Sequence, residues 1–246
     1  MIRLILVAFF LIAFLILSAI PLLIGEYLIY KNDEKKQQEY CLKVAQAMFR
    51  MLLRLTGSKI TVKGRERIPE GAVLYVGNHR SYFDILLTYS RCRRLTGYVA
   101  KKEMEKIPLL STWMKNLYCL FLDRDNMREG LKTILQAIDY VKNGISICIF
   151  PEGTRNKGDE LLPFKDGAFK IAQKAGCLII PVAICGTDKC MEANKHNFLH
   201  SSKVVIEFLE PVDIRGLKPK ERKEVLDAIP GKIQAARLKN LPMTEK

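Results

Sequence analysis

The sequence predicts an α/β fold, with a largely parallel sheet flanked by helices and preceded by an N-terminal membrane-associated helical hairpin. Two observations lead to this prediction. After residue 57, short β-rich runs alternate with helical stretches, which is the pattern of a sheet covered on both faces. The chain also opens on a long apolar segment that is followed by a basic amphipathic one. We therefore expect residues 1–57 to form a membrane-anchoring two-helix segment and residues 58–246 to form one α/β domain.

The apolar segment covers residues 4–25, which contain no charged side chain. As a helix rising ~1.5 Å per residue it is long enough for a hydrocarbon core of ~30 Å. A cleaved signal peptide has a shorter apolar region, and "SAIP" is a poor cleavage site. The pattern is compatible with a helix that crosses the bilayer, with one that lies in a single leaflet, and with a buried core helix.

The second helix is predicted within residues 31–57, where apolar side chains recur at helical spacing. They are Cys41, Val44, Ala45, Met48, Met51, Leu52 and Leu55. Much of the opposite face is basic, with Lys43, Arg50 and Arg54. Such a helix lies flat on an anionic bilayer or packs on the rest of the protein, and the pattern fits both arrangements.

Seven β-rich runs predict the strands of the domain. They are residues 59–64, 72–78, 96–101, 118–124, 145–153, 178–186 and 202–212. The predicted helices are residues 83–92, 109–117, 128–144, 164–176 and 218–240. Polar loops follow three of the strands, with the sequences "GNHRSYFD", "DRDN" and "PEGTRN". In a parallel sheet the ligand crevice lies at the carboxyl ends of the strands, so we expect these loops to meet there.

The chain is strongly basic, with 40 Lys and Arg against 26 Asp and Glu and a net charge of +14. This balance indicates a polyanionic partner, which can be nucleic acid, an anionic lipid surface or a phosphate-bearing substrate. Nucleic acid is disfavoured because the basic run at residues 91–106 contains one aromatic side chain, Tyr98. The seven cysteines show no CxxC spacing, which argues against both a disulfide framework and a zinc site.

His79 and Asp84 in the first polar loop admit two interpretations. Ser81 and Asp84 have the spacing of a capping box at the start of the helix predicted at residues 83–92. Alternatively, Asp84 accepts a hydrogen bond from one ring nitrogen of His79 and leaves the other free as a general base. Both can hold at once. The G-x-S-x-G pattern of a serine hydrolase is absent, so a base here acts on a substrate hydroxyl or on water.

The loop "FPEGTRNKGD" has glycines at the spacing of a Walker A motif, but Asp159 occupies the lysine position. We therefore reject a Walker A loop. Arg155 in this loop is a forked donor that suits phosphate, and the alternative is a surface turn with a solvated arginine.

Four blocks in order, spanning roughly residues 73–186, resemble the glycerolipid acyltransferase family, specifically the bacterial 1-acyl-sn-glycerol-3-phosphate acyltransferases. They are "NHRSYFD", "KKEMEKIP" continuing to "FLDR", "FPEGTR" and "IIPVAI". The resemblance implies that residues 58–246 are an acyltransferase domain, with His79 as general base and Asp84 as its orienting partner. It assigns substrate binding to Asn78, Lys101, Arg124, Glu152, Gly153, Thr154 and Arg155.

The implied reaction moves a fatty acyl group from acyl-CoA or acyl-carrier protein to lysophosphatidic acid, giving phosphatidic acid without a cofactor or metal. The implied location is the bacterial inner membrane, with the catalytic domain on the cytoplasmic side of an anionic bilayer. Asn156, Met104 and the Arg80–Ser81 pair depart from the commonest family pattern. The acceptor can therefore also be glycerol-3-phosphate or another lysolipid. A separate alternative is that the chain is a non-catalytic module that binds anionic lipid.

Overall fold

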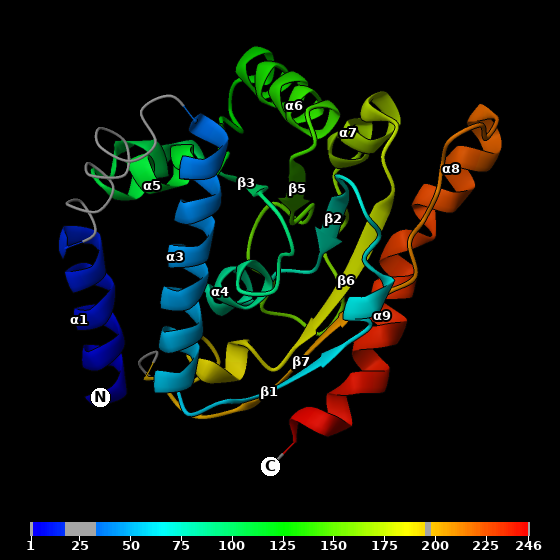
Figure 1. Ribbon diagram of the computed structural model, residues 1–246. Helices are drawn as coiled ribbons and strands as arrows, with labels where there is room; N and C mark the ends of the chain where they lie inside the picture. The colour runs from blue at the N-terminus through cyan, green and yellow to red at the C-terminus, as the bar shows by residue number, and fades with distance from the viewer. Residues whose placement is uncertain (1, 18–32, 195–197, 246) are drawn as a thin grey trace.

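The computed structural model describes residues 2–17, 33–194 and 198–245 and contains a seven-stranded sheet in the order β1-β7-β6-β2-β5-β3-β4 (Figure 1). The strands are β1 Lys59–Lys63, β2 Leu74–Gly77, β3 Thr96–Lys101, β4 Leu120–Leu122, β5 Ser146–Ile149, β6 Ile179–Cys185 and β7 Lys203–Phe208. Each lies inside one of the seven predicted runs. The prediction of seven strands is therefore confirmed, although several strands are shorter than the β-rich run that contains them.

The strands β6, β2, β5, β3 and β4 run parallel to one another. Strand β7 runs antiparallel to β6, and β1 pairs in parallel with β7 at the sheet edge. The prediction of a largely parallel sheet is thus confirmed. Because β2 and β5 are parallel neighbours, the loops after their carboxyl ends emerge side by side.

Helices cover both faces of this sheet (Figure 1). They are α3 Glu34–Leu55, α4 Phe83–Tyr89, α5 Leu110–Asn116, α6 Met127–Lys142, α7 Gly167–Ala175, α8 Pro219–Asp227 and α9 Ile229–Asn240. The prediction of one continuous helix over residues 218–240 is wrong, since α8 ends before Ala228 and α9 begins after it. Pro230 lies in the first turn of α9, where its missing N–H and fixed φ favour a new helix start.

Each face of the sheet contributes to its own hydrophobic cluster. Tyr75 of β2 faces the cluster that includes Leu42 of α3 and Leu87 of α4. Its neighbours Leu74 and Val76 point to the opposite cluster, as the alternation of side chains along a strand requires. Burying a large aliphatic side chain of this kind contributes about 1.5–3 kcal/mol. This two-sided core fixes the register of β2 and therefore the position of the loop that follows it.

Helix α1, Ile2–Leu17, lies beside α3 at one edge of the molecule (Figure 1). Phe14 of α1 packs on Trp113 of α5 with ring centroids 5.1 Å apart. The buried face of α3 belongs to the hydrophobic cluster that contains Tyr75. Within the described residues, no helix has both the length and the apolar character to cross a membrane. Residues 18–25 of the predicted apolar segment lie outside the described residues.

Candidate active site

His79 and Asp84 form a hydrogen-bonded pair at the carboxyl end of β2. His79 lies just after the strand, and Asp84 lies in the first turn of α4. The Nδ1 atom of His79 is 2.8 Å from Oδ2 of Asp84, and the Asp84 side chain is fully buried. The predicted contact between the two residues is therefore present in the structure.

The Asp84 carboxylate is held by three further donors. Oδ2 accepts from the backbone N–H groups of Arg80 at 2.6 Å and Ser81 at 2.8 Å, and Oδ1 accepts from Thr187 Oγ1 at 2.5 Å. Because this carboxylate acts as the acceptor, Nδ1 of His79 is assigned as the donor. That tautomer leaves an electron pair on Nε2, which is the arrangement of a general base.

The predicted capping box is half formed at the start of α4. Asp84 accepts from the backbone N–H of Ser81, as a capping carboxylate does. The Ser81 hydroxyl accepts from Phe83 N at 3.0 Å and donates to Glu192 Oε2 at 2.7 Å. The same Asp84 oxygen therefore caps the N-terminus of α4 and orients the His79 ring.

The loop after β5 fixes His79 from the other side. The backbone N–H of His79 donates to Glu152 Oε1 at 2.8 Å, and its carbonyl accepts from Asn156 N at 2.7 Å. The imidazole stacks on Phe150, with centroids 4.4 Å apart and planes 14° apart. Contacts from two directions thus hold the ring in one place, and 15% of the side chain stays exposed.

Asn78 and Glu152, which the resemblance assigns to substrate binding, lie beneath the surface. The Asn78 amide is fully buried and pairs with both backbone groups of Ile184 in β6, at 2.8 and 3.0 Å. The Glu152 carboxylate is 5% exposed and also accepts from Asn156 Nδ2 and Leu162 N, both at 3.0 Å. These contacts join the loop after β2 to β6 and to the loop after β5.

Arg155 lies over Tyr82 beside the pair. Its guanidinium carbon is 3.7 Å from the Tyr82 ring centroid, and Nη2 donates to the Tyr82 hydroxyl at 3.1 Å. Thr154 is exposed next to it. Gly153 has a φ of 73°, and an added Cβ would lie 3.1 Å from the Lys165 side chain, so the turn favours glycine.

Glu192, which no sequence motif marks as functional, connects the two loops. Its Oε1 accepts from Arg155 Nη1 at 3.2 Å and from Tyr82 N at 2.9 Å, in addition to the Ser81 contact. Nearby, Asp188 pairs with Arg80 at 2.9 Å. Both acids belong to a segment after β6 that carries no recognisable motif, so the sequence contained no signal for them.

Lys101 and Arg124 lie farther along the sheet. Lys101 ends β3, is exposed and pairs with Glu103 at 3.7 Å. Arg124 is exposed after β4, which is three strands from β2, or about 14 Å at the usual strand spacing. Within the described residues, no hydrogen bond or ion pair joins either side chain to the His79–Asp84 pair.

In the part of the chain that the structure describes, no group of three or more His, Cys, Asp or Glu side chains is placed to hold a metal ion. The seven cysteines are free, and six of them are buried. Burial raises the pKa values of Cys177 and Cys185 to about 11. These thiols are therefore protonated at neutral pH.

The model of the family described as Acyltransferase matches residues 59–185, the segment that contains both loops of the site. A probable 1-acyl-sn-glycerol-3-phosphate acyltransferase of Mycoplasma pneumoniae is 32% identical over 182 residues, covering 71% of this chain and 68% of that protein. A 1-acyl-sn-glycerol-3-phosphate acyltransferase of Escherichia coli is 35% identical over 169 residues, with 68% of each chain covered.

The fold is also similar to a solved structure. The crystal structure of the 1-acyl-sn-glycerophosphate (LPA) acyltransferase from Thermotoga maritima superposes with a TM-score of 0.78 and 28% identity. The similarity covers 96% of both chains. It therefore extends well beyond residues 59–185, which the family model matches.

Proposed function

The chain belongs to the acyltransferase family, and we propose that it transfers a fatty acyl group to the free hydroxyl of 1-acyl-sn-glycerol-3-phosphate, giving phosphatidic acid. The observation that carries the proposal is the contact of 2.8 Å between His79 Nδ1 and Asp84 Oδ2. It supplies a base whose second nitrogen is available to an incoming hydroxyl group. Within the described residues, no serine or cysteine side chain is hydrogen-bonded to the His79 ring, so the substrate itself supplies the nucleophile.

In the proposed reaction, Nε2 of His79 takes the proton of the acceptor hydroxyl as its oxygen attacks the thioester carbonyl. The tetrahedral intermediate collapses with loss of a thiolate, which receives the proton from the imidazolium. The products are a new ester and a free thiol. Asp84 keeps the ring in the correct tautomer and stabilises the imidazolium during the transfer. We propose no cofactor for this chemistry, and the donor is acyl-CoA or acyl-carrier protein.

We assign the substrate phosphate to the surface around Arg155, where Gly153 and Thr154 leave the backbone accessible. Lys101 and Arg124 are proposed as outer phosphate contacts, because their exposed side chains extend from the same carboxyl edge of the sheet. For Asn78 and Glu152 we propose positioning roles in place of direct substrate contact. Their burial and their backbone partners support that role.

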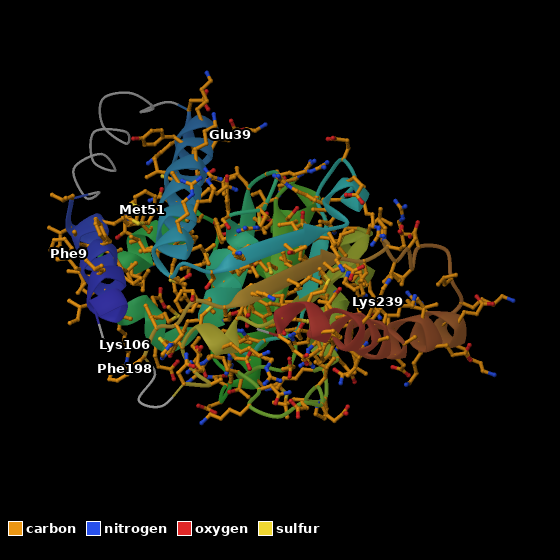
Figure 2. All side chains as sticks on the ribbon, turned by 90° about the horizontal axis from the view of Figure 1, so that it is seen from below. Phe9, Glu39, Met51, Lys106, Phe198 and Lys239 are labelled. Atoms are coloured by element: carbon orange, nitrogen blue, oxygen red, sulfur yellow. The ribbon has the colours of Figure 1, made fainter. Side chains whose placement is uncertain are left out.

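We also propose that the chain binds an anionic bilayer through α1, at the cytoplasmic side of a bacterial inner membrane. Four large apolar side chains at helical spacing are 57–62% exposed on α1, namely Ile5, Phe9, Ile12 and Ile16. Figure 2 shows Phe9 on the side of α1 that faces away from the sheet. The chain thus combines an exposed apolar stripe on α1 with a net charge of +14. This combination is expected of a protein that inserts apolar side chains among anionic lipids.

An acceptor panel tests the proposed reaction. Full-length protein in detergent micelles receives labelled acyl-CoA or acyl-carrier protein together with lysophosphatidic acid, glycerol-3-phosphate or a neutral lysolipid. We expect thiol release that depends on lysophosphatidic acid. A preference for glycerol-3-phosphate would change the acceptor, and lipid binding without thiol release would leave a non-catalytic module.

A further inference from the structure

A second basic site lies at the C-terminal end of α3. A hollow of about 200 Å³ opens there between α3, β1 and the segment after α4. Its lining residues are Arg50, Leu53, Arg54, Ser58, Ile60 and Arg91. Three of the six are arginines, and no lining residue is acidic.

These three arginines lack carboxylate partners in the described part of the chain. The arginines that do form ion pairs within the described residues lie elsewhere in the molecule. They are Arg67, Arg80, Arg94, Arg155 and Arg215. Arg91 donates to the Leu87 carbonyl at 3.2 Å and contacts the Ser90 hydroxyl, so neutral groups hold its guanidinium in place. Arg50 and Arg54 are exposed one helical turn apart on α3.

The grouping of charge is unfavourable without an anion. Burial lowers the pKa of Arg91 to about 10, and the positive charges of Arg65 and Arg50 act in the same direction. Repulsion among like charges around a partly desolvated cavity is relieved when a negative group enters it. Guanidinium groups recognise phosphate oxygens through paired N–H donors, which a hollow with three arginines offers from several sides.

We propose that this hollow binds a phosphate group, carried either by an anionic lipid headgroup or by a free phosphate compound. It is separate from the Arg155 surface, because α4 begins beside Asp84 and ends before Arg91. At ~1.5 Å per residue, Asp84 and Arg91 are about 10 Å apart along that helix. Leu53 and Ile60 give the hollow an apolar side against which the carbon atoms of a glycerol ester can pack.

A pair of matched double variants tests the site. Arg50→Gln with Arg54→Gln removes two charges that line the hollow, whereas Lys35→Gln with Lys43→Gln removes two exposed charges from the same helix outside it. Both variants retain Arg155, so a difference in binding between them is due to the hollow and not to the Arg155 surface. Binding is measured as the thermal shift with inorganic phosphate and as co-sedimentation with phosphatidylcholine vesicles containing phosphatidylglycerol.

We expect the arginine variant to bind at least one of these probes roughly tenfold more weakly than the lysine variant, because charge-assisted hydrogen bonds are lost. A loss with inorganic phosphate indicates a free phosphate compound, and a loss with vesicles alone indicates a lipid headgroup. Equal responses of the two variants in both assays would overturn the proposal. The single variant Arg91→Gln should show the same defect, and the exposed pair keeps the test valid if Arg91→Gln fails to fold.

Discussion

The carboxylate of Glu192 lies 3.2 Å from the guanidinium of Arg155 and also accepts hydrogen bonds from Ser81 and Tyr82. It therefore joins the loop that carries His79 to the loop that carries Arg155, the residue to which we assign the substrate phosphate. The ring and the hydroxyl of Tyr82 also contact the Arg155 guanidinium. A residue that belongs to neither loop thus bridges the proposed base and the proposed phosphate contact.

Replacing Glu192 should affect substrate binding more than chemistry. Without its carboxylate, Arg155 loses the partner that orients it, so Glu192→Ala should raise the KM for lysophosphatidic acid by roughly tenfold and change kcat less. Glu192→Gln retains one oxygen acceptor and should recover part of the loss. Glu39 is an exposed acidic residue on α3, and Glu39→Gln is the control (Figure 2). An unchanged KM in Glu192→Ala would contradict this role.

His79→Ala should lower kcat by about 10²–10⁴-fold, the usual contribution of a positioned general base. Its fold should persist, because Glu152 and Asn156 hold the backbone of residue 79 and not its ring. Thermal unfolding and detergent-dispersed activity, measured on one preparation, separate the two effects. Turnover at the wild-type rate would exclude His79 as the base.

Asp84→Asn should impair both activity and stability. The buried carboxylate accepts from two backbone N–H groups and from Thr187, so an amide would leave at least one buried group mismatched, at a cost of about 1–3 kcal/mol. The amide would also disturb the tautomer of His79 and lower kcat at temperatures where the variant stays folded. Denaturant unfolding of Asp84→Asn and His79→Ala compares the costs, and an equal loss of stability in both would contradict the buried role of Asp84.

Thiol reagents should leave the reaction intact. Burial raises the pKa of Cys177 and that of Cys185 to about 11, so their reactive thiolates are scarce at pH 7 and increase only as the pH approaches this value. Treatment with iodoacetamide at pH 7 should therefore give little labelling by intact mass and no loss of activity. Inactivation that tracks the alkylation of one cysteine would indicate a cysteine acyl intermediate instead.

The sequence pattern located all seven strands. The central strands β2, β5 and β6 are short apolar runs because they are buried on both sides of the sheet, whereas the edge strand β1 is largely exposed and has an alternating sequence. The contact between His79 and Asp84 was also predictable, since both residues lie within one loop and one helical turn. The polar contacts between residues far apart in the sequence could not be predicted. Glu192 reaches Ser81 across more than a hundred positions, and Thr187 reaches Asp84 across a similar span, through a segment without periodicity or motif. Asn78 and Glu152 were identified as functional, but only the folded backbone shows that their polar atoms face inward.

Polar substitution on α1 should release the protein from membranes without impairing its chemistry. Phe9 and Ile12 are 62% and 57% exposed, and inserting each into a bilayer contributes about 1.5–3 kcal/mol, so Phe9→Ser with Ile12→Ser should weaken vesicle binding by at least tenfold. The matched control is Leu131→Ser with Leu135→Ser on α6, where both leucines are 56% exposed. Vesicle co-sedimentation is measured beside acyl transfer to a short-chain, micelle-free acceptor, which needs no bilayer.

Equal binding of both double variants would show that the exposed stripe on α1 is not the membrane-facing surface. A loss of activity toward the soluble acceptor would show instead that α1 supports the catalytic domain through the packing of Phe14 on Trp113.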